Sequence, residues 1–299
     1  MIAKEYHAAP GGNVAPPTGK HAPDSNPPAS MNPRKVLVIG GGDVGSAIAC
    51  RLFGLGVRVL LSERESSPHA RRGMAFTDAL FEGRSQLCGV EACRQADIAG
   101  VEECWQRNAA IPVVTLPERL LTAAIHFDVI VEATMRRNHV PPDLRGAAPL
   151  VIGLGPGYAP GRNCHVAIET QWGAQMGEVL RDRPAAERSG GPRPLAGIAR
   201  ERFALSPCAG VWRTHAQLGE RVVAGQPVGD IAGQVLAAPI TGHLRGLARD
   251  GVAVLAGQRL VEVDPRDEPQ VFGLGERPDA IARGVMRAMG FTDAAAGAR

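Results

Sequence analysis

Short apolar runs, separated by glycine-rich or polar segments, divide the first half of the chain into predicted strands. The runs lie at residues 35–39, 57–61, 111–116, 128–133, 150–152 and 166–170. Runs rich in Val, Ile and Leu are typical of strands buried on both faces of a sheet. Apolar residues at helical spacing predict helices over residues 46–52 and, from Pro278, over residues 278–289. This alternation predicts an α/β Rossmann-like domain with a parallel sheet.

The first predicted strand runs directly into three consecutive glycines. Gly40, Gly42 and Gly45 match the G-x-G-x-x-G pattern of dinucleotide-binding loops, and Gly41 and Asp43 lie among them. In that pattern the first glycine permits a tight turn, the second admits a pyrophosphate, and the third lets helix and strand pack closely. The following helix would offer N–H groups to an anion. The alternative is a glycine turn that only packs this helix.

An acidic residue follows the second predicted strand, where such loops place the group that binds the ribose. Glu63 lies about 20 residues beyond the glycines and would accept hydrogen bonds from the ribose hydroxyls of NAD. Two alternatives stay open: the neighbouring Arg64 meets a 2′-phosphate, or Glu63 is only a solvated charge. The pattern favours a nucleotide site, with NAD(P) as one candidate cofactor.

Basic residues occur at two further places in this half of the chain. Arg71 and Arg72 precede a short helical pattern, and Arg136, Arg137 and Asn138 follow the end of the fourth predicted strand. Ligands of open parallel sheets gather at the carboxyl ends of strands. Guanidinium groups bind phosphate or carboxylate through a planar fork. We expect the four arginines to converge on one anionic ligand, and solvated surface arginines are the alternative.

A second glycine-rich loop follows the predicted strand at residues 150–152. It contains Gly153, Gly155 and Gly157, and Pro156 stiffens it. This loop is interpreted either as a backbone nest for an anion or as a tight structural turn.

The second half contains an internal repeat. Pro207, Gly210, Gly219 and Ala224-Gly225-Gln226 recur, each 32 positions later, as Pro239, Gly242, Gly251 and Ala256-Gly257-Gln258. Two such units predict one small interlocked all-β domain, which resembles the barrel-sandwich hybrid of biotinyl and lipoyl carriers. Those carriers present a lysine on the hairpin between the halves. Here the hairpin is Ala232-Gly233-Gln234, and no lysine follows Lys35, so we expect neither biotin nor lipoate.

These patterns predict the domain boundaries. We expect a disordered leader, the parallel-sheet domain, a linker rich in Pro, Gly and Arg, the β domain with its repeats, and a C-terminal helix and tail. They cover residues 1–33, 34–180, 181–202, 203–266 and 267–299 respectively.

Composition and charge exclude several classes of function. The net charge of +3 and the 4% of aromatic residues do not favour a nucleic-acid partner. The six cysteines form no C-x-x-C motif, so they are interpreted as scattered thiols. The sequence has neither a secretory apolar segment nor a run long enough to span a membrane. We therefore expect a cytoplasmic protein without a membrane partner.

The order of these motifs resembles the YqeB-type accessory family, which is associated with selenium-dependent molybdenum hydroxylases. The motifs that carry the resemblance lie at residues 40–43, 71–83, 136–138, 149–157, 168–170 and 264–266. The resemblance implies a maturation factor for a molybdenum hydroxylase, with a molybdopterin nucleotide as a second candidate ligand. Its implied partners are that enzyme or other maturation proteins.

The chain departs from the family pattern at three places. Ile39 replaces a basic residue, residues 171–174 read Gln-Trp-Gly-Ala in place of Asn-Arg-Gly-His, and Ser189-Gly190-Gly191 replaces a Thr-Gly motif. Selenium dependence is therefore not carried over. A free-standing NAD(P)-dependent oxidoreductase and a non-catalytic scaffold are the alternative functions.

Overall fold

The structure is a computed structural model that describes residues 34–292 except residues 66, 136–140 and 188–189. All of these described residues belong to one compact unit that begins at Pro33. None of the helices among them is both long and apolar enough to cross a membrane. The leader predicted at residues 1–33 lies outside the described residues, and the predicted boundaries of the later domains stay predictions.

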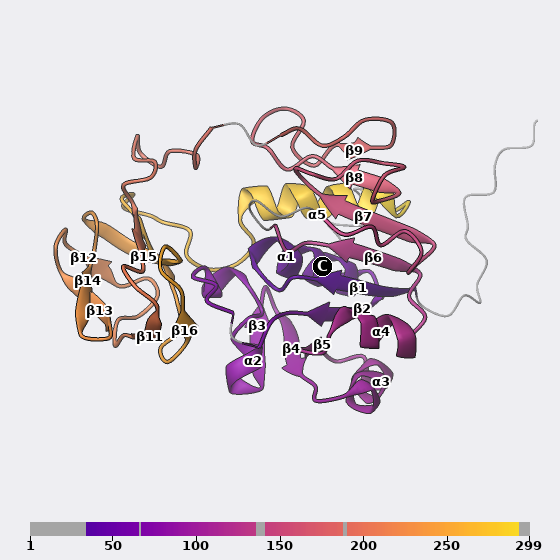
Figure 1. Cartoon of the computed structure of the whole chain (residues 1–299), viewed down its shortest axis with the longest axis horizontal. Helices are drawn as coiled ribbons and strands as arrows, with labels where there is room; N and C mark the ends of the chain where they lie inside the picture. The colour runs from indigo at the N-terminus through magenta and orange to yellow at the C-terminus, as the bar shows by residue number, and fades with distance from the viewer. Residues whose placement is uncertain (1–33, 66, 136–140, 188–189, 293–299) are drawn as a thin grey trace, which may run out of the picture. The chain divides into compact units, whose positions relative to one another are not determined.

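A nine-stranded mixed sheet dominates the first part of the chain, in the order β3-β4-β5-β2-β1-β6-β7-β8-β9 (Figure 1). The strands from β4 to β8 in this order run parallel to their neighbours. An antiparallel strand closes each edge, because β3 pairs with β4 and β9 with β8 in that sense. The strands are β1 (Lys35–Ile39), β2 (Arg58–Ser62), β3 (Arg84–Leu87), β4 (Val90–Arg94), β5 (Ile111–Val114), β6 (Val129–Glu132), β7 (Leu150–Leu154), β8 (Val166–Ile168) and β9 (Val179–Leu180).

Helices cover both faces of this sheet. The helices are α1 (Asp43–Gly54), α2 (Ala79–Glu82), α3 (Ile98–Arg107), α4 (Glu118–Ala124) and α5 (Glu276–Ala288), with a 3₁₀ turn η1 (Arg72–Met74). Alternate side chains of β1 point to opposite faces. Val36 and Val38 pack with α1 and α5, whereas Leu37 packs with Trp105 of α3 and Leu121 of α4.

The helix α5 confirms the amphipathic helix expected at residues 278–289. Its buried side chains include Ile281, Val285 and Met286, which join the same core as Ile48 and Leu52 of α1. Figure 1 shows α5, in yellow, beside α1. The C-terminal end of the described chain therefore completes the core of the nine-stranded sheet, because this helix covers one of its faces.

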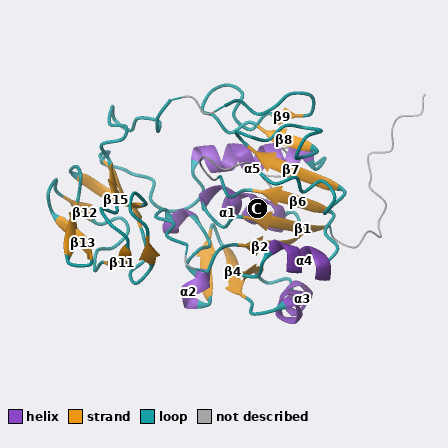
Figure 2. Cartoon of the chain, in the orientation of Figure 1, coloured by secondary structure: helices purple, strands orange, loops and turns teal. Residues whose placement is uncertain are grey.

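The second part of the chain forms two antiparallel four-stranded sheets, β10-β17-β15-β12 and β14-β13-β11-β16. Figure 2 shows strands joined by loops here, and Trp212, Leu244 and Val261 lie in the core that these strands form. The strands are β10 (Phe203–Leu205), β11 (Gly210–Arg213), β12 (Arg221–Val222), β13 (Pro227–Ile231), β14 (Gln234–Ala237), β15 (Gly242–Leu247), β16 (Ala253–Val254) and β17 (Arg259–Asp264).

The 32-residue repeat is visible in this topology. Strands β10 to β13 form the first copy and β14 to β17 the second, so that β11 corresponds to β15 and β13 to β17. Corresponding strands lie in opposite sheets, and each copy supplies two strands to each sheet. Neither copy could therefore form either four-stranded sheet alone.

The structure corrects the predicted fold class, a Rossmann-like parallel sheet followed by a barrel-sandwich hybrid. The large sheet is mixed, and the C-terminal strands form two separate antiparallel sheets. The prediction failed at β3 because its residues Arg84–Leu87 are mostly exposed and polar. Such an edge strand lacks the apolar run by which the buried strands were recognised.

Candidate functional site

The glycine loop connects β1 to α1 at the carboxyl end of β1. Gly40 has φ of +104°, and a Cβ there would lie 2.8 Å from backbone atoms of Ala133 and Thr134. A Cβ on Gly45 would lie only 1.8 Å from the Gly40 carbonyl oxygen. The tight turn and the close approach of helix to strand thus require glycine at both positions.

The loop leaves the N-terminus of α1 without a side-chain cap. Gly42 is the N-cap residue and has no side chain to accept a hydrogen bond, whereas Asp43 Oδ1 accepts from Val44 N–H at 3.0 Å in the first turn. The first N–H groups of a helix have no acceptor within the helix. They also carry the positive end of the helix dipole. The loop therefore presents backbone donors that suit an anion.

Two polar side chains fix the shape of the loop. The Glu63 carboxylate accepts hydrogen bonds from Gly41 N–H at 2.8 Å and from Arg64 N–H at 2.7 Å. The buried Ser46 hydroxyl donates to the Gly41 carbonyl and accepts from Phe76 N–H, both at 2.9 Å. Glu63 thus holds the loop backbone, and the binding of a ribose by this residue stays a prediction.

Arg71 links the glycine loop to β17 through two carboxylates. Its Nη1 lies 2.9 Å from Asp43 Oδ2, and its Nε and Nη2 lie 2.7 and 3.1 Å from the two oxygens of Glu262. Burial alone would raise the pKa of Asp43 and of Glu262. The Arg71 guanidinium makes the largest contribution against burial, and with other nearby cationic groups it holds each pKa at about 2. All three side chains are therefore charged at neutral pH.

Further arginines surround the same buried carboxylate of Glu262. Arg245 Nη1 lies 2.8 Å and Arg202 Nε 3.4 Å from Glu262 Oε1. Asp264, two residues along β17, pairs with Arg266 at 2.5 Å. Fully buried acids require such partners, because an unpaired buried charge is costly. Sequence analysis did not predict this cluster, since Arg202 and Glu262 are 60 residues apart.

Of the four arginines predicted to share one anion, two bind groups of the chain itself and two lie outside the described residues. Arg72 donates from Nε to the Leu247 carbonyl at 3.0 Å and from Nη1 to Asp78 at 3.3 Å. Arg136, Arg137 and Asn138 lie outside the described residues. Carboxylates of the chain itself thus offset the charges of Arg71 and Arg72, and convergence on a ligand stays a prediction.

His69, which the sequence analysis did not select, lies against the glycine loop. Its ring atoms Cε1 and Nδ1 are 3.3 Å from the place that a Cβ of Gly42 would take. Burial lowers the pKa of His69, which favours the neutral imidazole. Within the described part of the chain its buried Nε2 has no hydrogen-bond partner. An unpaired buried polar atom beside the helix N-terminus is a position where a ligand group would be accommodated.

The second glycine loop lies beside β6 and is closely packed. A Cβ on Gly153 would lie 2.0 Å from Cδ1 of Tyr158, and Gly155 has φ of +77°. The Tyr158 hydroxyl donates to the buried carboxylate of Glu132 at 2.5 Å, and Thr134 donates to the same carboxylate. Gly153 lies in β7, and its close packing against Tyr158 favours a structural role for this glycine. A ligand role for Gly155 and Gly157 stays a prediction.

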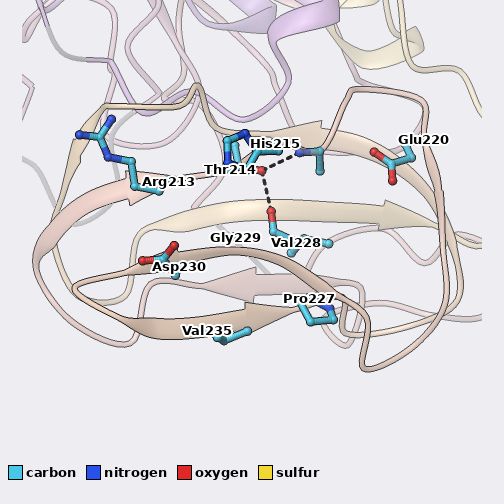
Figure 3. A pocket seen from close by; sticks show the side chains of 10 residues that line it. Arg213, Thr214, His215, Glu220, Pro227, Val228, Gly229, Asp230 and Val235 are labelled. Atoms are coloured by element: carbon cyan, nitrogen blue, oxygen red, sulfur yellow. Dashed lines mark hydrogen bonds between the residues drawn. The ribbon is translucent and has the colours of Figure 1, made fainter.

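Two cavities among the described residues lie away from the glycine loops. One of about 430 Å³ lies in the second part of the chain (Figure 3). There the Thr214 hydroxyl donates to the Val228 carbonyl at 2.5 Å and accepts from Ala216 N–H at 3.1 Å. The other, of about 540 Å³, is lined by α4 residues and by residues 146–149.

Among the described residues no group of three His, Cys, Asp or Glu side chains could hold a metal ion.

Comparison with known proteins gives one sequence relative. The chain is 32% identical over 255 residues to the uncharacterized protein YqeB of Escherichia coli K12. The chain is similar to YqeB. The match covers 85% of this chain and 47% of the relative, so the chain spans about half of that protein's length. It supports the YqeB-type resemblance, whereas the association with molybdenum hydroxylases stays a proposal. No family model matches the chain.

Two solved structures have weak similarity to this chain. An aspartoacylase family protein from Mesorhizobium loti is 10% identical to this chain, with a TM-score of 0.27. The match covers 79% of this chain and 87% of that protein. A succinylglutamate desuccinylase/aspartoacylase from Rhodobacter sphaeroides is 16% identical with a TM-score of 0.26 and the same coverage.

Proposed function

We propose that this protein is an accessory protein that binds a phosphate-bearing ligand at the glycine loop. The observation that carries the proposal is the N-terminus of α1. Gly42 caps this helix without a side chain, and Gly40 and Gly45 bring the turn and the helix close together. A phosphate group needs this combination of backbone donors and space.

The charges around the loop support an anionic ligand. Arg71 neutralises Asp43, so the acid at the start of α1 does not act as an isolated negative charge. The neutral ring of His69 adds a nitrogen atom that has no partner among the described residues. Glu63 already accepts from Gly41 N–H, and Asp43 Oδ1 accepts from Val44 N–H, so the proposal assigns the phosphate to the other N–H groups of the loop and the first turn of α1.

The finer proposal concerns the ligand and the client enzyme. The resemblance to the YqeB type supports a role in the maturation of a molybdenum hydroxylase, with a molybdopterin nucleotide or NAD(P) as ligand. The similarity to YqeB over 85% of the chain supports the resemblance on which this proposal rests.

Calorimetric titration of the full chain with NAD, NADP, ATP and a cytidine-linked molybdopterin tests the proposal. We expect saturable heat with at least one ligand. Gly42→Val should abolish this heat, because its branched side chain would crowd the loop, where even a Cβ would lie 3.3 Å from the His69 ring. Gly146→Val is the matched control, since a Cβ at Gly146 meets nothing within 4 Å. The absence of saturable heat with all four ligands would refute the proposed function.

A further inference from the structure

Two cysteines that are 11 residues apart lie in contact on the nine-stranded sheet. Cys93 is on β4 and Cys104 is on α3, and their Sγ atoms are 3.2 Å apart. The contact arises because α3 connects β4 to β5 and turns its buried face, with Val101 and Trp105, toward the sheet. This helix is held firmly, since Trp105 Nε1 donates to the Val59 carbonyl at 2.9 Å.

The surroundings of the two sulfur atoms differ. Cys93 is half-buried and accepts a hydrogen bond from Gln95 Nε2 at 3.1 Å. Cys104 is buried, and its thiol also lies 3.4 Å from the Ala110 carbonyl. Hydrogen bonds from the Cys104 thiol and the Gln95 amide lower the pKa of Cys93, whereas its contact with Cys93 and burial raise the pKa of Cys104. The more accessible sulfur is thus the better nucleophile.

We propose that Cys93 and Cys104 form a reversible disulfide when the protein reacts with a hydroperoxide. The Cys93 thiolate attacks the peroxide, so an S–O bond forms, the O–O bond breaks, and the leaving alkoxide or hydroxide takes a proton. Cys93 is then a sulfenic acid. The Cys104 thiol loses its proton and attacks the Cys93 sulfur, the S–S bond forms, and the hydroxyl group leaves with that proton as water. Each peroxide molecule thus removes two electrons in total from the pair of thiols.

Little movement separates the dithiol from the disulfide. A disulfide has an S–S length of about 2.05 Å, so the sulfur atoms need to approach by roughly 1.2 Å from their present separation of 3.2 Å. The bond would fasten α3 to β4, and a small dithiol would reverse it by exchange.

The chain contains its own controls. Cys88 is exposed and Cys208 is half-buried, and no sulfur–sulfur contact involving either is present among the described residues. If exposure alone governed oxidation, Cys88 would react before Cys93. Under the proposal the partnered sulfur of Cys93 reacts instead.

The experiment treats the reduced full chain with one equivalent of hydrogen peroxide and identifies the products by mass spectrometry after cleavage at glutamate. This cleavage places Cys88, Cys93 and Cys104 in three different peptides. We expect a loss of about 2 Da, from two hydrogen atoms, and one peptide pair linked through Cys93 and Cys104. Dithiothreitol should restore both thiols, and Cys88→Ser should behave as wild type.

Two variants test the order of the steps. Cys104→Ser should leave a sulfenic acid on Cys93 that dimedone traps, whereas wild type should give no such adduct. Cys93→Ser should yield no linked pair. The proposal is wrong if Cys93 and Cys104 both remain open to alkylation in peroxide-treated wild type, or if either is joined to another cysteine. The wild-type measurement decides the question even where a variant fails to fold.

Discussion

Replacement of Arg71 by methionine is the most informative perturbation of the link between the glycine loop and β17. Met keeps much of the length of Arg71 and removes its charge, so Asp43 loses its ion pair with Arg71 and Glu262 keeps its pairs with Arg245 and Arg202. The side chains of Arg71, Asp43 and Glu262 are 24%, 17% and 0% exposed, so solvent screens these pairs only in part.

The structure gives the magnitude of the effect. A fall in the pKa of Asp43 from 3.8 to about 2 corresponds to about 2.4 kcal/mol of stability at neutral pH. Glu262 has its pKa lowered from 4.5 to about 2, and its other arginines would retain part of that stabilisation. We therefore expect Arg71→Met to lower the free energy of unfolding by about 3 kcal/mol at pH 7, in the range for breaking a buried pair.

The pH dependence distinguishes an ionic effect from lost packing. Both carboxyls have a lower pKa in the folded than in the unfolded chain, so their stabilisation is present above pH 4.5 and is lost as the pH falls toward 2. The difference between wild type and Arg71→Met should therefore shrink progressively between pH 5 and pH 2, a window set by these pKa values.

Urea denaturation followed by tryptophan fluorescence provides the assay. Trp105 is buried in the core of the nine-stranded sheet, and Trp212 is buried in the core of the antiparallel sheets. Their fluorescence therefore follows the unfolding of both parts of the chain. Arg64→Met is the control, because the Arg64 side chain is 64% exposed and its Nε lies 3.8 Å from the Glu63 carboxylate. We expect no measurable change for it. A destabilisation by Arg71→Met that is equally large at pH 3 and pH 7 would refute the electrostatic reasoning.

Two further predictions concern the glycine loop. Ser46→Ala should cost about 1–3 kcal/mol in the free energy of unfolding, because it leaves the buried N–H of Phe76 without its acceptor, and a loss below about 0.5 kcal/mol in the same urea assay would contradict this. Gly40→Ala should lower the melting temperature sharply, since φ there is +104° and the new Cβ would lie 2.8 Å from the Thr134 backbone, whereas Gly146→Ala should change it little. Similar melting temperatures for these two glycine variants would show that the turn tolerates a side chain.

Apolar patterns predicted the central strands because those strands are buried on both faces. The run at residues 35–39 is the strand β1, and the one at 128–133 contains β6 (Val129–Glu132). The polar strand β3 and the two-residue strand β9 make the sheet mixed and have no comparable signal, since edge pairing depends on neighbours brought together by the fold.

The candidate site was predictable only in its local part. The spacing of Gly40 and Gly45 indicated a tight turn against a helix, and the structure has that geometry. The partners of Arg71 could not be predicted, because Glu262 lies 191 residues further along the chain. Sequence spacing identifies backbone geometry within a few residues, but a pairing of charges over such a distance depends on the completed fold.

The exchange of strands between the two 32-residue copies has a consequence for folding kinetics. Since each copy contributes two strands to each antiparallel sheet, both sheets should form or dissolve in one cooperative event. Such long-range pairing forms slowly, because loops must close before contacts compensate for the lost entropy. Glu262 lies on β17 within this unit. Each global opening of the sheets would release Arg71, so their unfolding rate limits how long the glycine loop keeps this ion pair.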